Sequence, residues 1–157
     1  EFRRVLFRSL YGLHTTGLRY FTVYGPWGRP DMAYFKFAEK ILKGESINVF
    51  NNGKMKRDFS YIDDIILGTK SAIKKNYKCE LFNLGNNKKE ELMQLIKLIE
   101  NELGKRANIK FQPMQSGDVI ETYADISESR RKLNYKPKTS IKDGIPKFIN
   151  WYKNYIV

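Results

Sequence analysis

The chain has 157 residues, of which 41% are hydrophobic, so we expect one globular domain with a real core rather than a disordered segment. The formal net charge of +12 comes mainly from lysines scattered among acidic residues, which is typical of a solvated surface; it argues against a nucleic-acid site but can help to attract a small anionic ligand. The single cysteine cannot form an internal disulfide, which favours the reducing cytoplasm, and with the single histidine it cannot form a zinc cluster. The sequence also has no apolar run long enough for a transmembrane helix.

The first elements along the chain are predicted to be a strand and a helix. Residues 1–9 show no signal-peptide cleavage site and no clear join to the residues after them, and we interpret them as a foreign segment. Residues 14–23 are rich in β-branched and aromatic side chains, which predicts a buried strand that ends in a loop starting at Tyr24. Residues 32–43 place apolar side chains on one helical face and precede a glycine, so they predict a helix with its end at that glycine.

Two short strands and a helix are predicted next. Residues 46–50 and 57–62 have strand patterns, and the Asn-Gly pair between them suits a tight turn. A helix is predicted to begin at Asp63 and to end near Lys75, and we interpret Asp63 and Asp64 as its cap.

The second half continues the alternation of strands and helices. The pattern predicts a strand at residues 80–84, an amphipathic helix at 92–103, a strand at 109–111, a helix at 127–133 and a final helix capped by Ser140 and Asp143. We find no internal repeat or low-complexity linker, so the elements predict one compact α/β unit.

An arginine and an aspartate interrupt the apolar pattern of residues 56–64. The guanidinium of Arg57 is a planar fork that matches a phosphate or a carboxylate. Local chemistry alone favours a simpler explanation, an ion pair of Arg57 with Asp58 or Asp63 that orders the turn.

The segment from Arg57 to Asp64 resembles the arginine-aspartate-aromatic signature of the NAD-dependent epimerase/dehydratase family, the extended short-chain dehydrogenases. Residues 17–32 and 113–125 are similar to the UDP-glucuronate 4-epimerases of that family. The resemblance runs in unbroken order from Leu10 to about Tyr155. It implies an α/β fold for residues 10–157, the C-terminal part of a Rossmann-type extended short-chain dehydrogenase with its smaller substrate-binding region.

The resemblance also implies roles for individual positions. Tyr24 and Pro26 correspond to the loop at the nicotinamide end of the cofactor pocket, although loop packing explains Pro26 equally well. The implied substrate-binding residues are Thr22 and Arg29 at the sugar, Met32, Ala33 and Lys36 near the uracil and diphosphate, Val49 and Phe50 beside the uracil, Arg57 at the diphosphate and Asp118 at the ribose. Gln115 stands where many relatives carry arginine, which weakens one phosphate contact.

Two motifs of the family do not occur in the sequence: the glycine-rich dinucleotide fingerprint and the Tyr-x-x-x-Lys pair that exchanges the sugar hydroxyl proton. We therefore expect no catalytic residue and no metal site in this chain, NAD bound mainly by another part, and no turnover by the chain alone. The family reaction would interconvert UDP-glucuronate and UDP-galacturonate at C4 through a 4-keto intermediate, in a homodimeric parent enzyme that contacts neither nucleic acid nor membrane.

Three other functions stay open at this point. A nucleotide-sugar 4,6-dehydratase and a UDP-glucuronate decarboxylase share the fold and the arginine signature. From a different class, the chain could be a non-catalytic UDP-sugar-binding module, which the absence of the cofactor fingerprint supports.

Overall fold

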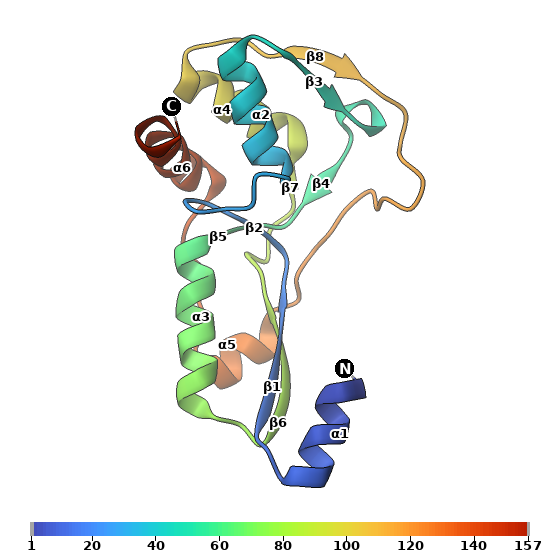
Figure 1. Cartoon of the computed structure of the whole chain (residues 1–157), viewed down its shortest axis with the longest axis vertical. Coiled ribbons are helices and arrows are strands. Elements are labelled where there is room, and N and C mark those ends of the chain that lie inside the picture. Colours follow the sequence, from blue (N-terminus) through green and yellow to red (C-terminus); the bar gives the residue numbers. More distant parts are fainter. Residues whose placement is uncertain (1, 157) are drawn as a thin grey trace.

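The helices and strands of the chain pack at the two ends of an elongated α/β structure (Figure 1). The computed structural model describes residues 2–156. The helices are α1 (Phe2–Tyr11), α2 (Ala33–Lys43), α3 (Ile62–Lys75), α4 (Leu92–Leu103), α5 (Ser127–Leu133) and α6 (Ile141–Tyr155). The strands are β1 (Thr15–Tyr20), β2 (Thr22–Tyr24), β3 (Ser46–Val49), β4 (Lys56–Arg57), β5 (Phe59–Tyr61), β6 (Cys79–Leu84), β7 (Glu90–Glu91) and β8 (Asn108–Phe111), with a short 3-10 helix, η1 (Asn51–Gly53), between β3 and β4. These elements confirm the predicted α/β class.

The strands pair in twos, and most of the pairs are parallel, as expected where helices connect strands. The parallel pairs are β1 with β6, β2 with β5 and β3 with β8, whereas β4 and β7 are antiparallel. Of the segment predicted to be foreign, residue 1 lies outside the described residues, and residues 2–9 belong to α1.

The predicted strand at residues 14–23 is two strands, because the chain changes partner at Phe21. The N–H of Phe21 donates to the carbonyl of Leu84 in β6, and the next N–H, that of Thr22, donates to the carbonyl of Asp58 beside β5. The prediction of a buried strand was also wrong, since β1 is partly exposed along its whole length.

The predicted strand at residues 57–62 is divided in the same way, at Asp58, into β4 and β5. The expected tight turn before it is the 3-10 helix η1, in which Asn51 and Asn52 adopt left-handed backbone angles, with φ of 51° and 49°. Asparagine tolerates this conformation better than most residues. The chain therefore leaves β3 without pairing it to the following strand.

The predicted helix ends are confirmed where local chemistry sets them. Gly44 and Gly104 end α2 and α4 in the left-handed conformation, with φ of 73° and 65°, which costs glycine least. The hydroxyl of Ser140 accepts the N–H of Asp143 at 3.3 Å and so caps α6.

The prediction that Asp63 and Asp64 cap α3 was wrong. The residue before the helix is Tyr61, and no side chain caps this end. The buried carboxylate of Asp64 instead accepts the N–H groups of Lys138 and Thr139 at 3.2 and 2.9 Å. It therefore ties α3 to the segment that leads into α6.

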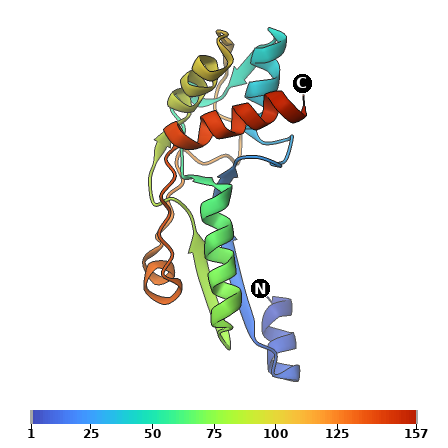
Figure 2. The same ribbon diagram turned by 90° about the vertical axis from the view of Figure 1, so that its left-hand side faces the viewer.

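Among the described residues, the buried apolar side chains form two hydrophobic clusters that stabilise the fold. The first lies between α2, α4 and α6 and includes Phe35, Ile96 and Phe148. Figure 2 shows α6 crossing the other two helices above α3. The second core lies where α3 and α5 cover β6, around Phe82 and Tyr135.

Gly144 lets α6 approach the buried ring of Tyr24. A Cβ at this position would lie 2.1 Å from the Tyr24 hydroxyl, which donates to the carbonyl of Ser140 at 3.1 Å.

We predict that Gly144→Ala lowers the free energy of unfolding by about 1–3 kcal/mol through overpacking, measured by urea denaturation. Asn150→Ala, at an exposed position of the same helix, is the matched control, and equal stability of the two variants would contradict this packing.

Candidate functional site

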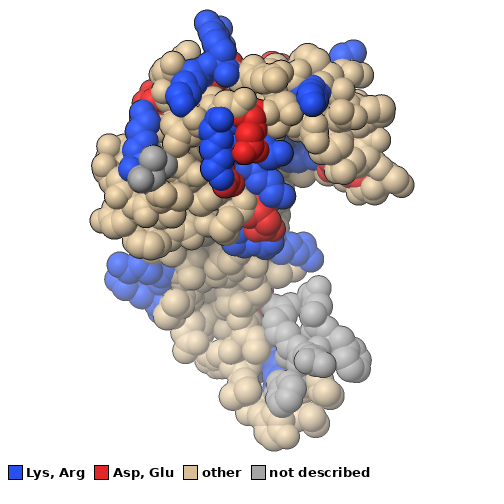
Figure 3. Space-filling view, turned by 45° about the horizontal axis from the view of Figure 1, so that its top comes forward, with Lys and Arg blue, Asp and Glu red and all other residues tan. Residues whose placement is uncertain are grey.

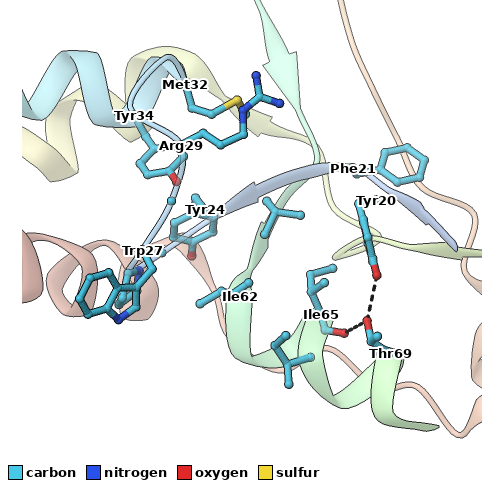
Figure 4. A pocket seen from close by; sticks show the side chains of 15 residues that line it. Tyr20, Phe21, Tyr24, Trp27, Arg29, Met32, Tyr34, Ile62, Ile65 and Thr69 are labelled. Atoms are coloured by element: carbon cyan, nitrogen blue, oxygen red, sulfur yellow. Dashed lines mark hydrogen bonds between the residues drawn. The ribbon is translucent and has the colours of Figure 1, made fainter. Parts of the chain in front are cut away.

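A cavity of about 530 Å³ lies between the end of β2, the following loop and the first turns of α3 (Figure 4). Most of its wall is apolar, and Ile62 and Ile65 of α3 form one side. At the far end the hydroxyls of Tyr20 and Thr69 are 3.2 Å apart, within hydrogen-bond distance. The cavity therefore suits a flat, mainly apolar group with few polar contacts.

The loop of residues 25–32 is shaped by two glycines against one tyrosine. A Cβ on Gly28 would lie 1.7 Å from the hydroxyl oxygen of Tyr34, and Gly25 has a φ of 140°, which side chains rarely adopt. Tyr34 is itself fully buried at the start of α2. The loop can follow this course because neither position carries a side chain.

An aromatic cluster holds the tip of the same loop. Trp27 adopts a left-handed backbone with a φ of 59°, unusual for a bulky residue. Its exposed ring lies 5.3 Å from the ring of Trp151 and 5.5 Å from that of Tyr155, measured between centroids. The end of α6 therefore supports the loop through aromatic contacts.

Both buried tyrosines of the cavity stay protonated at neutral pH. Burial raises the pKa of the Tyr34 hydroxyl to about 12. Burial, helped by the nearby Tyr61 and acidic groups, also raises the pKa of Tyr24 well above its ordinary value. Since the Tyr24 hydroxyl donates to the Ser140 carbonyl, it faces α6 and offers the cavity its ring.

This first cavity collects both residues predicted for the cofactor and two predicted for the substrate. Tyr24, Pro26, Arg29 and Met32 all line it. Arg29 is exposed, and its Nε donates to Asp31 at 3.0 Å, so its charge lies at the rim.

A second cavity, of about 520 Å³, lies on another side of α2. Ala33, Lys36 and Phe50 line it, three of the positions predicted to lie near the uracil and diphosphate. Val49 precedes Phe50 in the chain but is fully buried in β3, opposite Phe111 of β8. Val49 is therefore not among the residues that line this cavity.

Arg57 and Asp118 are 61 residues apart in the chain and form an ion pair, with 2.8 Å between Nη2 and Oδ1. The other terminal nitrogen of Arg57 donates to the carbonyls of Lys56 and Ile120, at 3.0 and 3.2 Å. The expected ion pair with Asp58 or Asp63 is thus replaced by one with Asp118.

Thr22 and Gln115 lie outside these clusters. Thr22 is partly buried in β2 and uses its N–H to bond the carbonyl of Asp58. Gln115 is exposed, and its main-chain carbonyl accepts the N–H of Asp118 at 3.2 Å.

Two residues that shape the site, Tyr34 and Asp58, were not predicted from the sequence. Tyr34 has an ordinary core position in the helical pattern, and only its contact with Gly28 reveals its second role. Asp58 is fully buried. Its one sequence signal was an acidic residue inside an apolar strand pattern, which is rare without compensating partners.

Charge on the surface is mixed. On the face shown in Figure 3, lysines and arginines lie mainly over the upper part of the molecule, with acidic residues among them. Lys43 pairs with Glu39, and Arg131 with Glu128. Within residues 2–156 no helix is long and apolar enough to cross a bilayer, and no three candidate ligand side chains come together around a metal position.

The sequence similarity to known proteins extends over nearly the whole of this chain. The family model of the NAD dependent epimerase/dehydratase family matches residues 5–85. An uncharacterized protein of Methanocaldococcus jannaschii is 55% identical over 147 residues, which cover 94% of this chain and 45% of that protein. UDP-glucuronate 4-epimerase 4 of Arabidopsis thaliana is 45% identical over 166 residues, 95% of this chain and 38% of the plant protein.

A solved structure has the same fold. It is the UDP-glucuronic acid 4-epimerase of Bacillus cereus in complex with UDP-glucuronic acid and NAD, with a TM-score of 0.89 and 35% identity over 96% of this chain and 48% of that chain. The chain spans about half the length of the curated relatives it matches.

Proposed function

The chain belongs to the NAD-dependent epimerase/dehydratase family, and we propose that residues 10–157 are the substrate-binding part of a nucleotide-sugar epimerase. The proposed reaction is the interconversion of UDP-glucuronate and UDP-galacturonate at C4. In this proposal the chain holds the UDP group.

The observation that carries the proposal is the pairing of Arg57 with Asp118. A guanidinium matches the geometry of a diphosphate, and a carboxylate accepts hydrogen bonds from ribose hydroxyls. Arg57 is held by the carbonyls of Lys56 and Ile120 and has more N–H donors than its bonds to described residues use. It can therefore bind a phosphate without losing its main-chain support.

The second cavity supports a place for the base of the nucleotide. Phe50 offers an apolar ring and Lys36 a positive charge, and both lie beside Ala33, the first residue of α2. The N-terminal turn of a helix favours anions through its free N–H groups. We propose that uracil occupies this cavity and that the diphosphate extends toward Arg57.

The first cavity fits the nicotinamide end of NAD, because its apolar wall and the ring of Tyr24 suit a flat ring. NAD would take up and return the hydride of the sugar carbon. Pro26 and Tyr24 would orient the ring, and Arg29 and Thr22 are proposed to contact the sugar carboxylate.

An exposed apolar face supports the idea that another part of the family fold packs here. On α3 the side chains of Ile66, Leu67 and Ile73 are 47%, 63% and 72% exposed. Among the described residues β1 pairs only with β6, so its other edge has no partner strand. Faces of this kind mark interfaces, and we propose that the cofactor-binding half packs on it.

Loss of Arg57 tests the proposed UDP site directly. We predict that Arg57→Ala weakens UDP binding by this chain roughly 10- to 100-fold, because a charge-assisted contact is lost. Titration calorimetry with UDP measures it. The control is Arg131→Ala, which removes an exposed arginine paired within α5; equal affinity of both variants for UDP would exclude Arg57 from the site.

Turnover separates an epimerase part from a non-catalytic binding module. The sequence contains no Tyr-x-x-x-Lys pair, so we expect the purified chain to produce no UDP-galacturonate from UDP-glucuronate and NAD. Product analysis by chromatography, with a full-length UDP-glucuronate 4-epimerase as positive control, measures this. Product formed by the pure chain would show that the chemistry resides in it.

A further inference from the structure

The carboxylate of Asp58 is fully buried and accepts four hydrogen bonds. The hydroxyl of Ser60 and the N–H of Asn86 donate to Oδ1, at 3.0 and 2.6 Å. The N–H groups of Asn87 and Ala124 donate to Oδ2, at 3.0 and 3.1 Å. Each oxygen thus has two donors, which compensates for removing the carboxylate from water.

These bonds join segments that lie far apart in the chain. Asn86 and Asn87 follow β6, and Ala124 ends the stretch that contains Asp118. The packing around the carboxylate is tight, because a Cβ on Gly85 would lie 3.2 Å from each of its oxygens and 2.3 Å from the Cβ of Ala124. The carboxylate and Ala124 therefore leave no room for a side chain at position 85.

The main chain of Asp58 adds two further links. Its N–H donates to the hydroxyl of Thr122 at 3.1 Å, and its carbonyl accepts the N–H of Thr22 at 3.1 Å. Lys56 continues the first of these links, because it exchanges main-chain hydrogen bonds with Ile120 and Thr122, at 3.0 and 3.1 Å. Residues 56–58 therefore hold the stretch 118–124 along most of its length.

Apolar burial does little to hold that stretch. Val119, Ile120 and Tyr123 are 52%, 58% and 50% exposed, and only Ala124 is fully buried. A segment with so little buried apolar surface depends on its hydrogen bonds for a fixed position. Asp58 supplies the bond at its buried end, and Arg57 the bonds at its start.

We propose that Asp58 is a positioning residue, which sets the distance between Arg57 and Asp118 by fixing residues 118–124 against β4. This inference rests on the proposed function, since it gives the two residues a shared ligand. The ligand is a nucleoside diphosphate, which needs the guanidinium and the carboxylate at a set separation. Asp58 touches no ligand itself and acts through its neighbours.

Substitution by asparagine tests this role with almost no change of shape. An amide has one oxygen and one NH2 group, whereas both carboxylate oxygens of Asp58 face main-chain N–H donors. In either orientation the new amide would set its NH2 group against one of these donors. We therefore expect Asp58→Asn to release residues 118–124.

Asp64→Asn is the matched control. Asp64 is also buried and also accepts main-chain N–H groups, those of Lys138 and Thr139, but it has no bond to residues 118–124. Thr122→Val is a milder second variant that keeps the shape and removes the acceptor of the Asp58 N–H. Thr122→Val tests the inference if Asp58→Asn does not fold.

The measurements are hydrogen exchange of the amides in residues 118–124 and UDP affinity by calorimetry, at a temperature where each variant is folded by circular dichroism. We expect faster exchange in this stretch and weaker UDP binding, on the order of tenfold for Asp58→Asn and roughly threefold for Thr122→Val. Asp64→Asn should change neither.

Two results would overturn the inference: unchanged exchange and affinity in both Asp58→Asn and Thr122→Val, or an equal effect of Asp64→Asn on both. A wild-type chain that does not bind UDP would instead refute the proposed function. In that case the exchange of residues 118–124 still decides whether Asp58 fixes this stretch.

Discussion

A buried carboxylate with four donors is the contact on which the rest of the candidate site depends. Asp58 lies where the chain passes from β4 to β5, so the network that satisfies its charge also divides the strand. The interruption leaves Arg57 on the short strand β4, directed at Asp118. The four hydrogen bonds compensate for the burial of this charge and join the segments that carry the proposed binding residues.

We propose that this chain holds a nucleotide ligand and that the chemistry takes place elsewhere in the enzyme. The paired Arg57 and Asp118 and the cavity beside α2 are built from elements within this chain. The apolar first cavity is bounded on one side by α3, whose exposed side chains suit a further packed layer. An enzyme whose binding energy comes mainly from the nucleotide, away from the reacting carbon, can retain the substrate while the sugar ring rotates.

Sequence patterns predicted the structure well where a few neighbouring residues decide the outcome. Gly44, Gly104 and Ser140 mark helix ends through backbone angle or capping, and these rules act within one turn. The patterns failed where a distant partner decides: the strand break at Phe21 depends on β6 and β5. Arg57 had two acidic neighbours in sequence but pairs with Asp118, which no local pattern reveals.

The position of bound UDP tests the central claim most directly. A crystal structure of this chain with UDP should place the diphosphate against the guanidinium of Arg57, the ribose hydroxyls against Asp118 and the uracil in the cavity lined by Lys36 and Phe50. UDP bound elsewhere, with the ion pair of Arg57 and Asp118 unchanged, would contradict the proposed site.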